Sequence, residues 1–325
     1  MRAIFLCDKA ETVFRVYDAE TLATLQTKLE LEARVYTKAE VLAEPARFAD
    51  VAILFSTWGM PTFTETEIKA TFPALTCVFY GAGTVQAFAR PFLACGVKVF
   101  SAWAANAVPV AEMTVAQIIL ANKGYFLANR LFHTKGHAVA KQAFKQCKGN
   151  YGETVGIIGA GMIGRLVIRM LKQYQVNVLV FDPFLPAEKA VELGVEKCQL
   201  AELFARAFVV SNHLANNPQT QGMLNYALFE QMRENAVFIN TGRGAQVVEA
   251  DLVRILTERP DLTALLDVTF PEPPTPEHPF YTLPNCLLTP HMAWAPVESR
   301  QRIQECTKRS IQGYLDGKPV NVVNP

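Results

Sequence analysis

The stretch TVGIIGAGMIG, residues 154–164, decides the fold of this chain, because it leads from an apolar run into a glycine-rich turn. TVGII predicts a buried strand, and RLVIRMLKQY, which follows directly, predicts an amphipathic helix. The next apolar run, VNVLVFD, ends in Asp182, eighteen residues after Gly164. Strand, GxGxxG turn, helix and a second strand with an acidic end form the fingerprint of a dinucleotide-binding βαβ unit.

Each residue of this fingerprint has a physical task. Gly159 would make the tight turn, Gly161 would let a pyrophosphate approach the backbone, and Gly164 would allow close helix packing. The helix N-terminus would point free N–H groups at the phosphates. Asp182 would accept hydrogen bonds from the adenosine ribose and repel a 2′-phosphate, which predicts NAD rather than NADP. The alternative interpretation is a plain tight turn and a solvated strand end.

Outward from this stretch, short apolar runs alternate with helical patterns along nearly the whole chain. Alternation of this kind predicts an α/β protein of two units, each with a parallel sheet covered on both faces. A single apolar helix over 109–132 separates the two series, and a helix over 298–317 closes the chain. The other predicted helices are 19–31, 64–72, 165–174, 225–232 and 249–256, and the predicted strands are 2–8, 32–37, 51–57, 75–81, 97–101, 154–159, 176–182, 208–212, 236–241, 264–268 and 286–291.

Composition excludes several classes of protein. With 31 Lys and Arg against 30 Asp and Glu, the total charge indicates neither a nucleic-acid partner nor an anionic membrane. No apolar run of membrane-spanning length is present, so we expect no membrane span, and the N-terminus does not resemble a signal peptide. The seven cysteines are scattered, odd in number and form no CxxC pair, which favours a reduced, cytoplasmic protein.

Three later stretches supply candidate chemistry: INTGRGAQVVE with Arg243, LLDVTFPEPP with Glu272, and LLTPHMAW with His291. Taken singly, each could be structural: a surface turn, a solvated carboxylate and a packed histidine. Together they suit the reduction of a 2-oxo acid. Arg binds a carboxylate through two parallel hydrogen bonds, His acts as acid or base near neutral pH, and a Glu bonded to the other ring nitrogen would orient it.

In these motifs the chain resembles the D-isomer-specific 2-hydroxyacid dehydrogenase family, in order and over nearly its whole length. The resemblance implies that Arg243 binds the substrate carboxylate and polarises its carbonyl, that His291 donates the proton in reduction, and that Glu272 is its partner. It also implies further contacts. The cofactor contacts would be Gly159, Gly161, Met162, Ile163, Gly164, Asp182, Leu214, Ala215, Thr241, Gly242 and Asp267; the substrate contacts would be Trp58, Ala82, Gly83, Asn106, Arg243 and Trp294; no metal is expected.

The family layout implies two Rossmann-like or flavodoxin-like domains on either side of a hinged cleft. The NAD-binding domain, 102–291, would be inserted into a substrate domain made of 1–101 and 292–325. The apolar helix near 110–130 would form a homodimer contact through the cofactor domain. His133 and His137, four apart on one predicted helix, could share a metal, but no third ligand is evident, which favours a solvated helix face.

The sequence departs from the family in two places. TVQAFARP replaces the usual run after the substrate loop, and VVSNHLANN lacks the proline that commonly follows its histidine. Trp294 after His291 is similar to some glycerate dehydrogenases, so hydroxypyruvate or glyoxylate is the first expected substrate. Alternatives are phosphite oxidation, phosphoglycerate oxidation, which the lack of Lys and Arg in STWGMP disfavours, and an NAD(H)-sensing binding protein of the corepressor type. The alternative for Trp58 and Trp294 is packing in a core or at the hinge.

Overall fold

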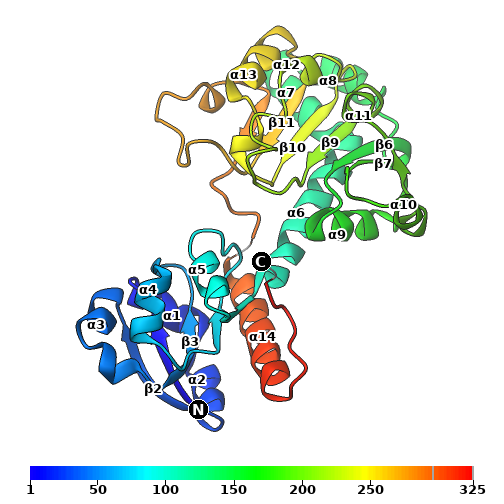
Figure 1. Cartoon of the computed structure of the whole chain (residues 1–325). Coiled ribbons are helices and arrows are strands. Elements are labelled where there is room, and N and C mark those ends of the chain that lie inside the picture. The colour runs from blue at the N-terminus through cyan, green and yellow to red at the C-terminus, as the bar shows by residue number, and fades with distance from the viewer. Residues whose placement is uncertain (295, 324–325) are drawn as a thin grey trace. The chain divides into compact units, whose positions relative to one another are not determined.

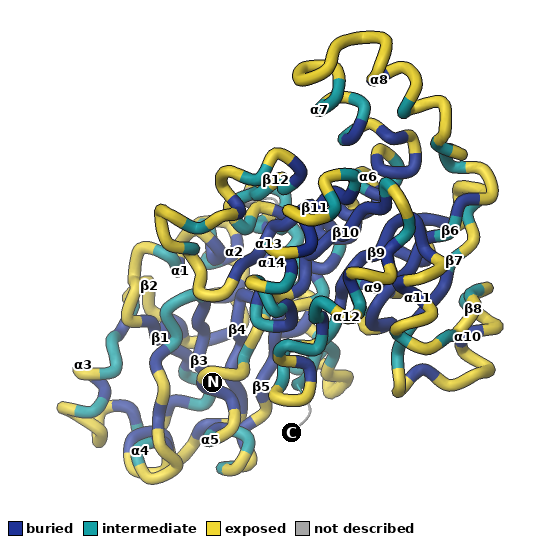
Figure 2. Tube along the Cα trace, turned by 90° about the horizontal axis from the view of Figure 1, so that it is seen from above, coloured by how far each residue is buried: buried dark blue, intermediate teal, exposed yellow. Residues whose placement is uncertain are grey.

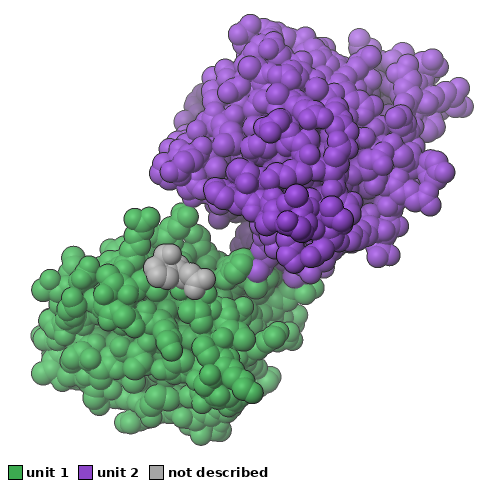
Figure 3. Space-filling view, turned by 45° about the vertical axis from the view of Figure 1, so that its right-hand side comes forward, with its two compact units in different colours: residues 1–106, 295–325 green, residues 107–294 purple. Residues whose placement is uncertain are grey.

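The computed structural model describes residues 1–294 and 296–323, which divide into two compact units (Figures 1 and 3). Unit 1 comprises Met1–Asn106 and the C-terminal segment that holds the last helix, and unit 2 comprises Ala107–Trp294. The chain therefore leaves unit 1, builds the whole of unit 2 and returns. Unit 2 begins five residues after the predicted limit at 102 and ends three residues after the predicted limit at 291.

Unit 1 is built on a five-stranded sheet in the order β2-β1-β3-β4-β5, with every pair parallel. This is the flavodoxin-like order of doubly wound sheets. The strands are β1 (Arg2–Leu6), β2 (Glu30–Tyr36), β3 (Val51–Ser56), β4 (Cys77–Tyr80) and β5 (Lys98–Ser101). The helices are α1 (Ala10–Val16), α2 (Ala19–Gln26), α3 (Lys38–Ala43), α4 (Glu65–Thr71), α5 (Ala89–Ala94) and α14 (Pro296–Leu315), with a 3₁₀ turn η1 (Pro45–Phe48).

Both faces of the inner part of this sheet are buried, which explains why β1, β3 and β4 are apolar at successive positions. The edge strand β2 is largely exposed. Successive side chains of β1 point to opposite faces: Ala3 and Phe5 join one core, and Ile4 and Leu6 join the other. Ile303 and Ile311 of α14 belong to the same core as Phe5. Burial of this apolar face holds the C-terminal helix in unit 1, although almost 200 residues of chain separate α14 from β5.

Unit 2 is built on a seven-stranded parallel sheet in the order β12-β11-β10-β9-β6-β7-β8. Counted from β6, the first six strands have the Rossmann order 3-2-1-4-5-6, and β12 extends it. The strands are β6 (Tyr151–Ile158), β7 (Gln175–Phe181), β8 (Glu196–Lys197), β9 (Val209–Asn212), β10 (Val237–Asn240), β11 (Thr263–Leu266) and β12 (Cys286–Leu288).

Helices cover both faces of this sheet. Figure 2 shows its central strands β6, β9, β10 and β11 largely buried, while α7 and α8 are largely exposed. The helices are α6 (Trp103–Asn122), α7 (Tyr125–Lys135), α8 (His137–Phe144), α9 (Met162–Leu171), α10 (Ala187–Leu193), α11 (Leu200–Arg206), α12 (Tyr226–Phe229) and α13 (Glu249–Glu258), with 3₁₀ turns η2 (Gly244–Gln246) and η3 (Pro279–Tyr281).

The predicted single helix over 109–132 is wrong, because the structure breaks it into α6 and α7 at Gly124. Gly124 has φ 70°, the left-handed region that favours glycine, and a Cβ there would lie 2.4 Å from Sγ of Cys147. A second break at Gly136, φ 83°, separates His133 on α7 from His137 on α8, so the two histidines do not share one helix.

Two other predicted helices are shorter in the structure. The pattern over 19–31 ends as α2 at Gln26, because Glu30 and Leu31 already pair with β1. The pattern over 225–232 forms only α12, Tyr226–Phe229. By length and composition alone α6 could cross a membrane, but half of the residues in its apolar window are buried, as in a core helix.

Candidate active site

The carboxyl ends of six adjacent strands lie in register along one edge of the unit 2 sheet. The paired residues are, in spatial order, Leu288, Leu266, Asn240, Asn212, Ile158 and Phe181. In four of the six, the residue that follows is a predicted site residue, and in the other two, after Leu288 and Asn212, it begins a stretch that contains one. The strand order reverses between β6 and β9, and this switch point is where open α/β sheets bind ligands.

The glycine-rich loop after β6 has the geometry that the fingerprint requires. Gly159 has φ 91°, and a Cβ there would lie 2.7 Å from the carbonyl oxygen of His213, at the end of the neighbouring strand. A Cβ on Gly164 would lie 2.0 Å from the oxygen of Gly159, so α9 packs against the loop as only glycine allows. At Gly161, the N-cap of α9, a Cβ would meet nothing within 4 Å. Met162 and Ile163 form the first turn of α9.

Asp182 is tied to the glycine-rich loop. One carboxylate oxygen accepts the N–H of Ala160 at 2.7 Å, and the other accepts the N–H of Phe184 at 2.8 Å. These bonds bring the end of β7 to the loop after β6. A carboxylate offers about four acceptor positions, so both oxygens keep capacity for a ribose hydroxyl.

A buried cluster of three amide side chains, Asn212, Asn240 and Gln246, joins the ends of β9 and β10. Nδ2 of Asn212 donates to Oδ1 of Asn240 at 3.0 Å and to Oε1 of Gln246 at 2.7 Å. Nε2 of Gln246 donates to the carbonyl oxygens of Leu214 and Ala215 at 2.8 and 3.0 Å. These bonds hold the loop after β9, where the family's usual proline is missing.

The same amide cluster holds the loop that carries Arg243. The N–H of Gly242 donates to Oδ1 of Asn240 at 3.1 Å, and the N–H of Arg243 donates to Oε1 of Gln246 at 3.3 Å. Thr241 is buried, with its hydroxyl 3.0 Å from that of Thr114. The Arg243 side chain is exposed, and its Nη1 donates to Gly242 at 2.7 Å.

His291 and Glu272, predicted as partners, are brought together. Nδ1 of His291 lies 2.5 Å from Oε1 of Glu272, and each side chain is 40% exposed. His291 has φ 50°, a left-handed conformation that is unusual for a residue other than glycine. Strained backbone of this kind concentrates at functional sites, where surrounding bonds hold it in place.

Asp267 supplies those surrounding bonds. Its carboxylate is buried and accepts the Thr289 hydroxyl at 2.6 Å, the N–H of Met292 at 2.8 Å and the N–H of Ala293 at 2.9 Å. The three donors lie on both sides of His291. Trp294 adds a fourth bond, because its indole N–H donates to the carbonyl oxygen of His291 at 2.8 Å.

Comparisons with known proteins identify the family of this chain. Residues 115–293 match the model of the "D-isomer specific 2-hydroxyacid dehydrogenase, NAD binding domain". The chain belongs to the D-isomer-specific 2-hydroxyacid dehydrogenase family. As in that family, its second unit carries an NAD-binding domain.

Two enzymes illustrate the relatives of this chain. A hydroxypyruvate reductase of Blautia hydrogenotrophica is 35% identical over 176 residues, 53% of each chain. A D-3-phosphoglycerate dehydrogenase of Archaeoglobus fulgidus is 30% identical over 230 residues, 70% of this chain and 43% of the relative. The matched parts thus span about half the length of these relatives. Apo D-mandelate dehydrogenase of Rhodotorula graminis has the same fold, with TM-score 0.81 and 20% identity over 100% of this chain and 98% of the other.

The predicted substrate residues Trp58, Ala82, Gly83 and Asn106 lie within unit 1. Ala82 and Gly83 follow β4, and the Ser101 hydroxyl donates to both of their carbonyl oxygens, at 3.0 and 2.5 Å. A Cβ on Gly83 would lie 3.5 Å from Nδ2 of Asn106, so these two residues are adjacent. Trp58 packs against the cores on both faces of the sheet.

The motifs that contain Arg243, Glu272 and His291 can be recognised in the sequence. The amide cluster and the hydrogen bonds of Asp267 cannot. The only sequence signal for the cluster is a set of amides, Asn212, Asn240 and Gln246, at or just after two apolar runs. Among the residues that the structure describes, no group of three His, Cys, Asp or Glu side chains could hold a metal ion.

Asp182→Ala is expected to weaken NADH binding roughly tenfold or more and to reduce any preference over NADPH, because it removes the predicted ribose acceptor and the bond to Ala160. Asp182→Asn, which keeps one acceptor oxygen, should have an intermediate affinity. Fluorescence titration of both nucleotides measures these affinities. A tighter fit of NADPH than NADH to the unmutated protein would contradict the assignment.

Burial lowers the pKa of His213, beside the glycine-rich loop, from 6.5 to about 4. The folded protein therefore favours the neutral ring, and this contribution to stability is present above pH ~6.5 and is lost as the pH falls toward 4. Between pH 7 and pH 5 the loss should be about 2 kcal/mol of unfolding free energy. Urea unfolding of the unmutated protein and of His213→Asn at both pH values measures it, and an equal loss in both proteins would refute the assignment to His213.

Proposed function

We propose that this chain is an NAD-dependent dehydrogenase that interconverts a 2-oxo acid and a D-2-hydroxy acid. The observation that carries the proposal is the contact between His291 Nδ1 and Glu272 Oε1, at 2.5 Å, on a strained turn that follows a strand of the NAD-binding domain. A histidine oriented by a carboxylate through one ring nitrogen can transfer a proton through the other.

The residues divide the work of the reaction as follows. NAD(H), when bound, supplies or accepts the hydride. With Nδ1–H donated to Glu272, His291 Nε2 gives its proton to the alkoxide oxygen in reduction and takes it back in oxidation. The negative charge of Glu272 stabilises the imidazolium that oxidation leaves. The Arg243 guanidinium pairs with the substrate carboxylate and draws electron density from the carbonyl oxygen.

The cofactor contacts follow the edge of the sheet. The pyrophosphate would lie at Gly161, Met162 and Ile163, where a Cβ on the glycine meets open space. Asp182 would bind the adenosine ribose. The nicotinamide would lie near Asp267, which keeps about one acceptor position after its three bonds. The remaining contacts, proposed on family resemblance, are Gly159, Gly164, Leu214, Ala215, Thr241 and Gly242.

For the substrate we favour hydroxypyruvate or glyoxylate. The relative named hydroxypyruvate reductase supports this choice. Backbone N–H groups at Ala82 and Gly83 would hold the carboxylate, and Asn106, Trp58 and Trp294 would line the pocket. A phosphoglycerate substrate, which other relatives' names suggest, needs cations for its phosphate, and residues 56–61 contain neither Lys nor Arg.

The test is oxidation of NADH by the purified protein with glyoxylate, hydroxypyruvate, pyruvate and bulkier 2-oxo acids, with NADPH in parallel. Rapid turnover of a small 2-oxo acid with NADH supports the proposal. Tight NADH binding without turnover of any 2-oxo acid would instead favour the second candidate, an NAD(H)-sensing binding protein. The free thiols of all seven cysteines support a cytoplasmic location for either activity.

Arg243→Ala and His291→Asn are each expected to lower kcat/KM by roughly two to four orders of magnitude, because one removes the carboxylate pair and the other the proton donor. NADH affinity should stay within about threefold, since neither side chain is assigned to the cofactor. Steady-state kinetics over pH 5–9 measure both effects. Normal turnover in Arg243→Ala, or an unchanged pH profile in His291→Asn, would contradict the assigned role.

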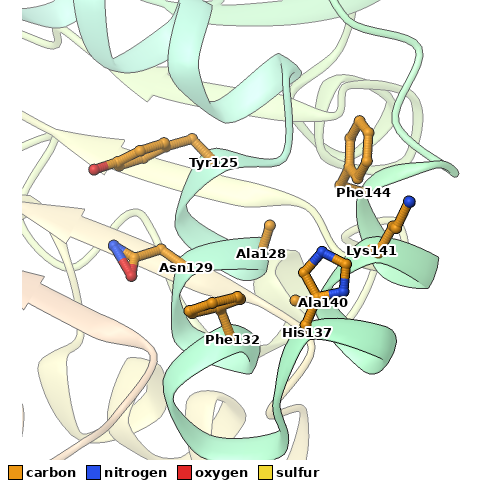
Figure 4. Close-up of a pocket in the computed structure, with 8 residues that line it drawn as sticks. All are labelled: Tyr125, Ala128, Asn129, Phe132, His137, Ala140, Lys141 and Phe144. Atoms are coloured by element: carbon orange, nitrogen blue, oxygen red, sulfur yellow. The ribbon is translucent and has the colours of Figure 1, made fainter.

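We also propose that the protein is a homodimer. Tyr125, Phe132 and Phe144 are 49%, 52% and 48% exposed around a groove of about 390 Å³ between α7 and α8 (Figure 4). Exposed aromatic groups on a groove are typical of protein interfaces. The groove is lined by Tyr125, Ala128, Asn129, Phe132, His137, Ala140, Lys141 and Phe144.

Replacement of Phe132 and Phe144 together by Ser should convert the dimer to a monomer, because it removes the aromatic anchors of the groove. Light scattering after size-exclusion chromatography measures the mass. Val191→Ser on α10, another exposed apolar side chain of unit 2, is the control and should remain dimeric. A monomeric unmutated protein, or a dimeric double variant, would refute this interface.

A further inference from the structure

The largely buried carboxylate of Glu249 holds both ends of the loop that carries Glu272. Glu249 is the first residue of α13, and its Oε1 accepts the N–H of Phe270 at 2.8 Å. Its Oε2 lies 3.2 Å from Nε2 of His278. Phe270 and His278 stand two residues before and six residues after Glu272, so the bonds of Glu249 close this loop at its base.

The hydrogen bonds define the tautomer of the neutral His278 ring. Its Nδ1 accepts the N–H of Phe280 at 3.3 Å, so the proton of the neutral ring is on Nε2, which donates to Glu249. The ring also packs on Phe280, with centroids 4.5 Å apart. The Glu249 and His278 side chains are only 13% and 17% exposed, which strengthens their bond relative to a pair at the surface.

Gly244, the residue after Arg243, also packs against the start of the Glu272 loop. A Cβ on Gly244 would lie 2.1 Å from the carbonyl carbon of Thr269 and 2.6 Å from the nitrogen of Phe270. The Arg243 loop and the Glu272 loop are therefore in direct backbone contact. Glu249, five residues after Gly244, adds its hydrogen bond to the same peptide group.

Glu272 itself is 40% exposed, so burial does not set the position of its carboxylate. We propose that Glu249 is a positioning residue for Glu272. By holding Phe270 and His278, it limits where the loop can move and keeps the Glu272 carboxylate against His291 Nδ1. This inference rests on the proposed acid–base function of the His291–Glu272 pair, and it adds Glu249 and His278 to the residues on which that pair depends.

The chain offers a matched control. Asp251 lies in the same first turn of α13 and also accepts a backbone N–H, that of Tyr226 at 3.0 Å, but among the described residues it has no hydrogen bond to the Glu272 loop. Asp251→Asn removes the same charge from the same helix end. Glu249→Ala removes both of its bonds to the loop. His278→Phe removes the bond to Glu249 and the acceptor for the N–H of Phe280, while a ring remains to pack on Phe280.

Two measurements test the inference. Amide hydrogen exchange of peptides covering 269–279 should be faster in Glu249→Ala and His278→Phe than in the unmutated protein, and unchanged in Asp251→Asn. With the best 2-oxo acid, Glu249→Ala should lower kcat about 10- to 100-fold, as expected for a misplaced catalytic group, with KM and NADH affinity within about threefold. Glu249→Gln, which keeps an acceptor for Phe270, should restore part of kcat.

A double variant separates positioning from a general loss of structure. If Glu249 acts through Glu272, then Glu249→Ala/Glu272→Ala should be no slower than Glu272→Ala alone. Multiplied losses in the double variant, or unchanged exchange in both Glu249→Ala and His278→Phe, would overturn the inference. If Glu272→Ala has the same kcat as the unmutated protein, the acid–base proposal is refuted. The predicted effect of Glu249 on kcat then fails with it, even if Glu249→Ala makes the loop exchange faster.

Discussion

The site depends on the parallel register of the unit 2 sheet. Because β12, β11, β10, β9, β6 and β7 end at paired residues, segments far apart in the sequence emerge side by side at one edge. A shift of one residue in any pair would turn every side chain of that strand to the other face, which both cores forbid. Packing of the apolar faces therefore fixes the chemistry at the edge.

At this edge, three carboxylates accept hydrogen bonds from loop N–H groups that have no partner in a helix or strand. Asp182 accepts an N–H of the glycine-rich loop, Asp267 accepts two N–H groups around His291, and Glu249 accepts that of Phe270. Bonds from backbone N–H to a carboxylate are stronger than bonds between neutral groups. Each carboxylate thus holds one loop: Asp182 the glycine-rich loop, Asp267 the loop of His291, and Glu249 the loop of Glu272.

Much of this could be read from the sequence, and the reason lies in local patterns. Buried parallel strands are apolar at most positions, and the glycine-rich turn has steric needs that only glycine meets, as Gly159 and Gly164 show. Helix prediction from the sequence fails where an apolar pattern continues past the end of a helix. The apolar period over 109–132 runs straight through Gly124, and only the close approach of Cys147 shows why a glycine ends the helix there.

The supporting residues could not be predicted for a different reason. Glu249 reads in the sequence as an acidic residue at a helix N-terminus, which the helix dipole alone would explain. Its two partners lie 21 and 29 residues away, beyond any spacing rule. Asp251 has the same local pattern and a different partner. Glu249 holds the Glu272 loop and Asp251 holds the start of α12, although both lie in one helical turn. Their roles therefore follow from tertiary contacts, and a structure was required to tell them apart.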